Sequence, residues 1–176
     1  MKKYLLLIPF VIFFLIFVIF FYLLIIERNP SALPSVFINK KAPIFKTMSL
    51  YDNKILVSNK EFGNQIVLVN FFATWCVPCK DEHHFITKLS NENKIKIIGI
   101  NYKDKSDKTK KWLKELGNPY EKVGIDKDGN IGIEWGVYGI PETYIVDKNS
   151  IVKYKYVGPI NKQTYKKIVS QIYKLK

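Results

Sequence analysis

The feature that most constrains the fold is a pair of cysteines placed shortly after a continuous apolar run. Residues 66–72 (Ile-Val-Leu-Val-Asn-Phe-Phe) are apolar apart from one asparagine, which is typical of a strand buried on both faces. The stretch Trp75-Cys76-Val77-Pro78-Cys79-Lys80 then holds the only two cysteines of the chain. Apolar side chains recur at helical spacing over residues 77–91. We therefore expect both cysteines at the start of a helix that follows a buried strand.

Two cysteines separated by two residues can close a redox-active disulfide, form an inert structural disulfide, or supply half of a zinc site. Structural zinc needs four ligands, and the sequence has no second cysteine pair; His83 could approach from the next helical turn, but a fourth ligand is missing. An inert bridge over two residues would constrain the unfolded chain little. We predict a redox-active Cys76–Cys79 disulfide that works without a further cofactor or metal.

Position predicts different roles for the two thiols. A cysteine at a helix N-terminus faces unpaired backbone N–H groups and the positive end of the helix dipole, which stabilise the thiolate. Cys76 precedes the helix and is expected to be exposed, so we predict that it attacks substrate. Cys79 lies one turn into the helix and is predicted to resolve the mixed disulfide. Pro78 suits an early helical position and stiffens the ring.

The chain after residue 40 alternates strand and helix signals. Further strands are expected at 95–102, 143–146 and 151–156, and further helices at 108–116 and from the capping residue Asn161 to the C-terminus. A strand–helix–strand–helix order followed by a hairpin and a helix is typical of an α/β domain with a mixed central sheet flanked by helices. We expect one such domain over residues 40–176.

The N-terminus is a separate apolar segment. Residues 4–26 carry no charge, and as a helix they would span roughly 34 Å, enough for the hydrocarbon core of a membrane. Lys2 and Lys3 precede the segment, whereas Glu27 and Arg28 cancel after it, so the positive-inside rule places the N-terminus in the cytoplasm. We predict an uncleaved signal anchor over residues 1–26, followed by a linker over residues 27–39. A cleavable signal peptide is the alternative, although its apolar core is usually only about 7–15 residues long.

The formal net charge of +13 suggests nucleic-acid binding as a function class, but the basic residues argue against it. Of the 28 basic residues, 27 are lysine, and Arg28 is the only arginine. Proteins that read nucleic-acid sequence depend on the planar arginine fork for bidentate contacts, which lysine cannot copy. The lysines are also scattered along the chain. We expect a solvated, lysine-rich surface and no nucleic-acid partner.

The active-site stretch resembles a known family. The passage from Asn70 to Cys79 is similar to the active site of thioredoxin-fold proteins. More narrowly, the chain resembles the membrane-anchored DsbE/CcmG family of thiol:disulfide interchange proteins, which serve cytochrome c maturation. The similar stretches are Asn-Tyr-Lys at 101–103, Trp-Leu-Lys-Glu-Leu-Gly-Asn-Pro-Tyr at 112–120 and Gly-Val-Tyr-Gly-Ile-Pro-Glu-Thr at 136–143. The resemblance runs from about residue 41 to the C-terminus.

The resemblance implies a thioredoxin fold with a central insertion, expected within residues 117–135. It implies a domain in the periplasm, held by a single-pass anchor in the bacterial inner membrane, that keeps the heme-binding cysteines of apocytochrome c reduced. Apocytochrome c or cytochrome c assembly proteins would be its partners, and a membrane thiol electron transporter would reduce it again. We expect the protein to act as a monomer. Pro141 falls where the family has a cis-proline opposite the disulfide, and a proline there leaves neighbouring backbone groups for a substrate strand.

Several residues beside the cysteines are candidates for tuning the thiols or lining the substrate groove. Ordinary thioredoxins carry a buried carboxylate six residues before the first cysteine, and Asn70 occupies that position here. Glu82 lies one turn after Cys79 on the same helical face and matches an acidic position of the family. We predict that it tunes the thiols or transfers protons; a solvated surface acid is the alternative. The full set of candidates is Trp75, Pro78, Glu82, Ile140, Pro141 and Glu142, whereas His83 and His84 are expected at the surface or in packing.

Other functions fit the sequence less well. A copper chaperone on this fold would need a wider cysteine spacing and a distant histidine, but no histidine follows His84. A peroxidase would need an arginine near the thiolate, and Arg28 lies beside the anchor. Residues 126–130 match the first positions of a calcium-binding loop, but Ile131 stands at the sixth position, where that motif needs glycine. We therefore expect a turn here. The sequence says little for or against a general extracytoplasmic thiol-disulfide reductase that is not dedicated to cytochrome c. Whether the pair acts as a reductant or an oxidant depends on its redox potential, which the sequence does not set.

Overall fold

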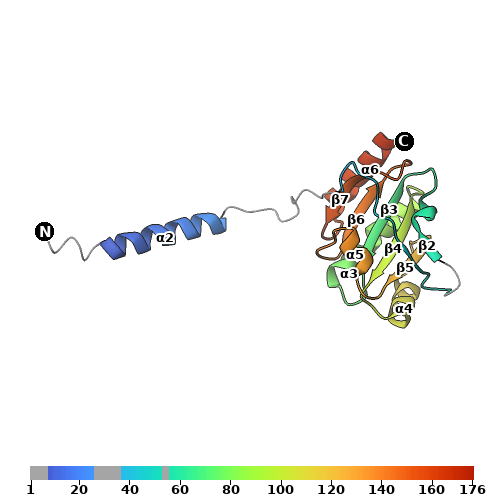
Figure 1. Cartoon of the computed structure of the whole chain (residues 1–176), viewed down its shortest axis with the longest axis horizontal. Helices are drawn as coiled ribbons and strands as arrows, with labels where there is room; N and C mark the ends of the chain where they lie inside the picture. The colour runs from blue at the N-terminus through green and yellow to red at the C-terminus, as the bar shows by residue number, and fades with distance from the viewer. Residues whose placement is uncertain (1–7, 26–36, 53–55) are drawn as a thin grey trace. The chain divides into compact units, whose positions relative to one another are not determined.

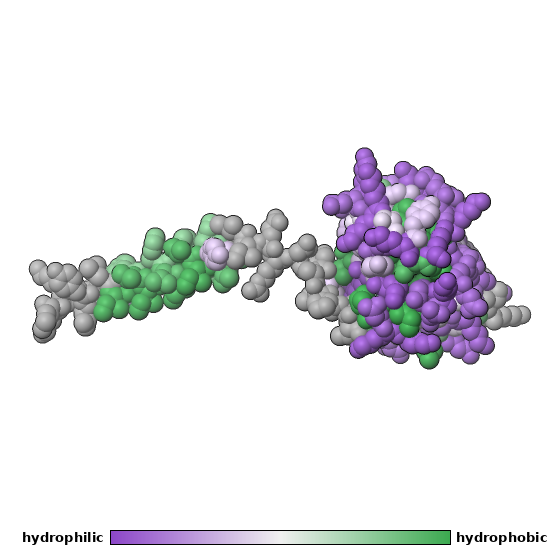
Figure 2. Space-filling model, turned by 90° about the horizontal axis from the view of Figure 1, so that it is seen from above, coloured by the Kyte–Doolittle hydropathy of each residue, from purple (hydrophilic) through white to green (hydrophobic). Residues whose placement is uncertain are grey.

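In a computed structural model of the protein, residues 8–25, 37–52 and 56–176 are described, and the chain divides into two compact units, residues 1–33 and 34–176 (Figure 1). The first unit contains the helix α2 (Ile8–Ile25). Its exposed side chains are mainly apolar, as Figure 2 shows in green. Within the described residues, the structure contains no helix with the length and apolarity required to cross a membrane. The predicted span 4–26 begins and ends outside the described residues.

The second unit is built on a five-stranded mixed sheet with the strand order β5-β4-β3-β6-β7. β3 pairs in parallel with β4 and antiparallel with β6, while β5 and β7 lie at the two edges. The strands are β3 (Val67–Phe72), β4 (Lys96–Tyr102), β5 (Lys122–Asp126), β6 (Glu142–Val146) and β7 (Val152–Val157), and the longer helices are α3 (Val77–Asn91), α4 (Ser106–Leu116) and α6 (Lys162–Leu175). The predicted mixed α/β architecture is confirmed.

Side-chain alternation along β3 separates the two hydrophobic cores, because successive residues of a strand point to opposite faces. Leu68 and Phe72 pack in one core together with buried residues of α3, α4 and α6. Val67, Val69 and Phe71 pack in the other core, around the fully buried Trp135. Asn70 is in phase with Leu68 and Phe72, so it points to the α3 side of the sheet.

The predicted central insertion, residues 117–135, contains an edge strand and a short helix that the sequence pattern did not indicate. The strand β5 continues the sheet in parallel beside β4, and the helix α5 (Asn130–Glu134) follows it. The Asp126 carboxylate accepts hydrogen bonds from the backbone N–H groups of Ile131 and Gly132, at 3.2 and 2.9 Å. Asp126, the first residue of the stretch for which we expected a turn rather than a calcium loop, therefore holds the start of α5.

The second unit also begins earlier and with more structure than the sequence predicted. A small antiparallel pair, β1 (Lys46–Met48) and β2 (Leu56–Ser58), precedes the 3-10 helix η2 (Asn59–Phe62). The pair packs tightly on β5. Gly124 of β5 leaves room for Thr47 of β1, since a Cβ atom at Gly124 would lie only 2.6 Å from the Thr47 Cγ2 atom. Within the predicted linker 27–39, residues 27–36 lie outside the described residues, but Phe37 packs on the core around Trp135. The Asn39 N–H donates to the Val152 carbonyl at 2.8 Å.

Candidate active site

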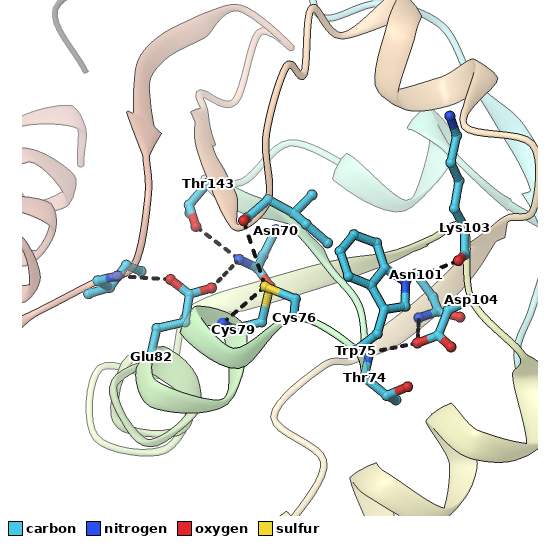
Figure 3. Close-up of a disulfide and its surroundings, with 12 residues drawn as sticks. Asn70, Thr74, Trp75, Cys76, Cys79, Glu82, Asn101, Lys103, Asp104 and Thr143 are labelled. Atoms are coloured by element: carbon cyan, nitrogen blue, oxygen red, sulfur yellow. Dashed lines mark hydrogen bonds between the residues drawn. A yellow bond between two sulfur atoms is a disulfide. The ribbon is translucent and has the colours of Figure 1, made fainter. Parts of the chain in front are cut away.

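The two cysteines form a disulfide at the N-terminus of α3, with an S–S distance of 2.03 Å (Figure 3). Cys76 is the N-cap of the helix, and its Sγ atom accepts a hydrogen bond from the backbone N–H of Cys79 at 3.2 Å. Pro78 lies in the first helical turn, where its missing N–H removes no helical hydrogen bond. The arrangement supplies the N–H group and the dipole that stabilise a thiolate at Cys76.

The prediction that Cys76 is exposed is wrong for this disulfide form. Cys76 retains only 5% of its accessible surface and Cys79 only 2%. Cys76 is covered because the loop before β6 approaches it: the Ile140 carbonyl oxygen lies 3.6 Å from the Cys76 Sγ atom. The residues on either side of Cys76, Trp75 and Val77, are apolar and are 57% and 71% exposed.

The loop before β6 carries the second part of the site. The Ile140–Pro141 peptide bond is cis, as the resemblance implied. Pro141 is buried, whereas Ile140 is half-buried beside the disulfide. The antiparallel pairing of β6 with β3 brings this loop to the end of β3 from which the disulfide turn departs. The two segments, far apart in sequence, therefore form one edge of the site.

Glu82 is a buried carboxylate on α3, and the surface alternative is wrong. It retains 1% of its accessible surface. The Asn70 Nδ2 group donates to Glu82 Oε1 at 2.9 Å, and the Ile160 backbone N–H donates to Oε2, also at 2.9 Å. The Asn70 side chain is oriented in turn by Tyr120, whose hydroxyl donates to Asn70 Oδ1 at 2.8 Å, and by a 3.0 Å bond to Thr143 Oγ1. Figure 3 shows Glu82, Asn70 and Thr143 gathered on one side of the disulfide.

The network places a carboxylate beside Asn70. Ordinary thioredoxins have an acid at the position of Asn70; here the acid is Glu82 of α3, which accepts a hydrogen bond from the Asn70 side chain. Burial raises the pKa of Glu82 to about 7, although the hydrogen bonds from Ile160 and Asn70 lower it. A carboxyl group with a pKa near neutrality can exchange protons with a thiol at physiological pH.

Glu142 does not line a groove; its side chain is fully buried. It alternates in phase with Tyr144 along β6, so it points into the core around Trp135. Its Oε2 atom forms an ion pair with the Lys155 Nζ atom at 3.0 Å and accepts from the Tyr144 hydroxyl at 2.7 Å. Its Oε1 atom accepts from the Tyr138 backbone N–H at 3.2 Å. Glu142 therefore ties the loop that carries Pro141 to β7.

On the other side of the disulfide, Trp75 is held by the loop after β4. Its indole Nε1 donates to the Lys103 carbonyl at 3.1 Å. The neighbouring Thr74 N–H donates to Asp104 Oδ2 at 2.6 Å. Although burial raises the pKa of Asp104, the hydrogen bonds from Thr74, Lys105 and Asn101 outweigh it and lower the pKa, so the carboxylate stays charged. The turn before Cys76 is thus fixed by backbone and side-chain bonds (Figure 3).

The histidines have no part in the disulfide contacts. His83 is buried against the Trp112 ring, with 4.5 Å between ring centroids, and its Nε2 donates to the Gly117 carbonyl at 2.9 Å. Burial lowers the pKa of His83, although the bond to Gly117 raises it. His84 is exposed. Within the described residues, no group of three or more histidine, cysteine, aspartate and glutamate side chains could hold a metal ion.

Sequence reasoning missed four residues that shape the site: Tyr120, Thr143, Asp104 and Lys155. Tyr120 and Thr143 lie inside stretches that carry the family resemblance, so their position was signalled although their contact with Asn70 was not. Asp104 is the second residue after β4, which pairs with the strand that leads to the cysteines, and the ends of parallel strands meet at one edge of a sheet. Lys155 gave no signal, because it lies on an edge strand where lysine is ordinary.

Comparisons with known proteins agree with this geometry. Residues 38–172 match the Redoxin family. The thiol:disulfide interchange protein DsbE of Haemophilus influenzae is 39% identical over 178 residues, which cover 98% of this chain and 96% of that protein. The chain belongs to the DsbE/CcmG family. The thiol:disulfide interchange protein CycY of Rhizobium leguminosarum bv. viciae is 39% identical over 132 residues, 75% of this chain and 71% of that protein.

The fold is also found in solved structures. The secreted thiol-disulfide isomerase of Corynebacterium glutamicum superposes with a TM-score of 0.70 at 18% identity, covering 84% of this chain and 96% of that chain. A DsbE/CcmG member with a Cys-x-x-Cys disulfide at a helix N-terminus is a thiol:disulfide oxidoreductase. The disulfide and the curated relatives both support this activity.

Proposed function

We propose that this DsbE/CcmG-family protein is a membrane-tethered reductant that keeps the heme-binding cysteines of apocytochrome c reduced during cytochrome c maturation. The observation that carries the proposal is the Cys76–Cys79 disulfide, which caps α3 and faces the Ile140 carbonyl. The direction of electron flow and the substrate come from the family resemblance. Apocytochrome c or cytochrome c assembly proteins are the proposed partners.

The proposed reaction moves two electrons from the protein to a substrate disulfide. The Cys76 thiolate attacks one substrate sulfur, the substrate S–S bond breaks, and the other substrate sulfur leaves as a thiolate. Cys79, after giving up its proton, attacks Cys76; the mixed disulfide breaks, and the second substrate thiolate leaves. The protein ends as the Cys76–Cys79 disulfide. The proton of Cys79 passes to Glu82, the buried carboxyl group one helical turn away, and from there to solvent.

To complete the cycle, a reductant must reduce the Cys76–Cys79 disulfide, and the protein must be held close to that reductant. A membrane thiol electron transporter would supply two electrons by the same exchange chemistry. We propose that residues 1–26 anchor the protein in the bacterial inner membrane with the second unit in the periplasm, on the strength of the uncharged run 4–26 and the charges that flank it. No cofactor beyond the disulfide and no nucleic acid takes part, and the protein works as a monomer.

Trapping of mixed disulfides in cells tests the proposal. Cys79→Ser should accumulate covalent adducts through Cys76, because a serine hydroxyl cannot resolve them. Cys76→Ser is the matched control and should accumulate few adducts, because Cys79 lies within the first turn of α3, whereas Cys76 is the N-cap residue, where the backbone N–H groups and the helix dipole favour the thiolate. Mass spectrometry of the adducts should identify apocytochrome c or a cytochrome c assembly protein.

Two results would contradict the proposal, one for the substrate and one for the attacking thiol. A broad set of unrelated exported proteins in the Cys79→Ser adducts would favour a general extracytoplasmic reductase. Equal trapping by the two variants would show that Cys76 is not the attacking thiol.

A further inference from the structure

A hollow lies next to the turn that precedes Cys76. Figure 3 shows two of the residues that border it, Trp75 and Asp104, on the other side of the disulfide from Glu82. The hollow has a volume of about 310 Å³ and is bordered by Thr74 and by Trp75, the residue before Cys76. This volume is at the lower limit of small-molecule sites, so the hollow has room for one or two amino-acid side chains and not for a large cofactor. Because Trp75 belongs to both the hollow and the disulfide turn, a polypeptide docked on Cys76 would reach it with its neighbouring residues.

The charges that border the hollow are strongly one-sided. Four lysines and one aspartate contribute: Lys103, Lys105, Lys108, Lys127 and Asp104. The four lysines are exposed. Over residues 8–25, 37–52 and 56–176 none of the four forms an ion pair. We refer to these four residues as the lysine pocket.

The one acidic residue of the hollow, Asp104, accepts hydrogen bonds from the backbone of the protein. Asp104 Oδ2 accepts from the Thr74 N–H at 2.6 Å, and Oδ1 accepts from the Lys105 backbone N–H at 2.7 Å. These bonds hold the loop after β4 against the disulfide turn. In the described part of the chain, Asp104 forms no ion pair with any of the four lysines. The fixed charge of the hollow is therefore about +3, four lysines against one aspartate.

The backbone of the loop that carries Lys103 is held in place by hydrogen bonds on both sides. Lys103 has a φ of +46°, in the left-handed region that non-glycine residues seldom adopt. Its N–H donates to the Asp126 carbonyl at 2.8 Å and its carbonyl accepts from Trp75. Figure 3 shows Trp75 between the disulfide and this loop. The loop that positions Trp75 thus also carries the lysine pocket.

We propose that the lysine pocket binds acidic residues that flank the cysteines of the protein's thiol partners. The inference rests on the proposed function, since it names the substrate class that the same disulfide favours. An aspartate or glutamate two or three residues from a substrate cysteine places its carboxylate among the lysines while the cysteine meets Cys76. Exposed charge pairs contribute modestly to affinity, but they speed encounter and select partners.

Exchange with matched peptides tests the pocket. The full chain in non-ionic detergent is reduced and mixed with three peptides that share one internal disulfide and carry aspartate, serine or lysine at the flanking positions. Acid quenching, alkylation and mass spectrometry give the rate for each peptide. At about 0.01 M salt, the aspartate peptide should react about fivefold faster than the serine peptide, and the lysine peptide slowest. The three rates should converge at about 1 M salt, where screening acts within about 3 Å.

A matched pair of variants separates the pocket from the overall charge of the protein. Lys105→Gln/Lys108→Gln should reduce the preference for the aspartate peptide over the lysine peptide at least threefold. Lys110→Gln/Lys114→Gln removes the same charge from exposed residues of α4 that do not border the hollow, and should keep the preference. The ratio of rates cancels any change in the thiols themselves.

The possible failures are distinguishable. Equal rates for the three peptides, or an equal loss of preference in both double variants, would overturn the lysine pocket and leave the proposed function standing. Failure to reduce any of the three peptides would overturn the proposed function, and the pocket with it.

Discussion

Replacing Glu82 by glutamine should remove a large part of the pH dependence of stability. Glu82 is buried, and burial raises its pKa from 4.5 to about 7. Between these two values the folded protein holds a proton that the unfolded chain has released. Stability from this group is therefore fully present below about pH 4.5 and is lost as the pH rises to about 7. Because one pKa unit corresponds to about 1.4 kcal/mol, the loss amounts to about 3 kcal/mol.

The assay is urea unfolding of the wild-type fragment 34–176 and of its Glu82→Gln variant at several pH values from 5 to 8. Glutamine cannot ionise, so the variant should lack this component. Burial lowers the pKa of His83, which makes stability rise with pH and opposes Glu82. The quantity to compare is thus the difference between the two proteins, which should change by about 2–3 kcal/mol in favour of the variant as the pH rises.

A difference that stays constant from pH 5 to 8 would refute the reasoning, because Glu82 would then titrate near its ordinary value despite its burial. The same variant tests the chemistry of the site. If Glu82 takes the proton of Cys79, the pH profile of disulfide exchange should shift in Glu82→Gln, whereas a purely structural role would leave the profile unchanged.

Two further predictions concern packing. Lys155→Met should lower the free energy of unfolding by about 3–5 kcal/mol, because it leaves the Glu142 carboxylate buried without its partner. Adding Glu142→Gln should recover much of that loss in urea melts. No recovery would refute the ion-pair explanation. The fragment 40–176 should be less stable than 34–176 by about 1–2 kcal/mol, because it lacks Phe37, which packs on the core; equal urea midpoints would show that this segment adds nothing.

The elements with a long, regular pattern could be predicted from the sequence. The run 66–72 became β3, and the spacing over 77–91 became α3 with the predicted bounds Val77–Asn91. Asn161 caps α6 as expected, accepting from the Gln163 and Thr164 N–H groups at 2.9 Å. In each case local periodicity and capping agree with the tertiary packing, so the local signal was sufficient.

The rest could not be predicted, because it depends on which segments meet. β1 and β2 have three residues each, too few for a period to show. Cys76 is covered by Ile140, 64 residues further along the chain. Glu142 pairs with a lysine of another strand, although the position after a groove proline had suggested exposure. Such contacts follow from strand register, which the sequence does not display residue by residue.

The central claim is that the Cys76–Cys79 pair donates electrons, and its redox potential tests this most directly. The full chain would be equilibrated in glutathione buffers of known ratio, and the fraction of disulfide would be read by alkylation and mass spectrometry. A donor of electrons should have a potential more negative than about −180 mV, on the side of thioredoxin at about −270 mV. A value near −120 mV, as for the strong oxidant DsbA, would show that the pair accepts electrons and would contradict the account.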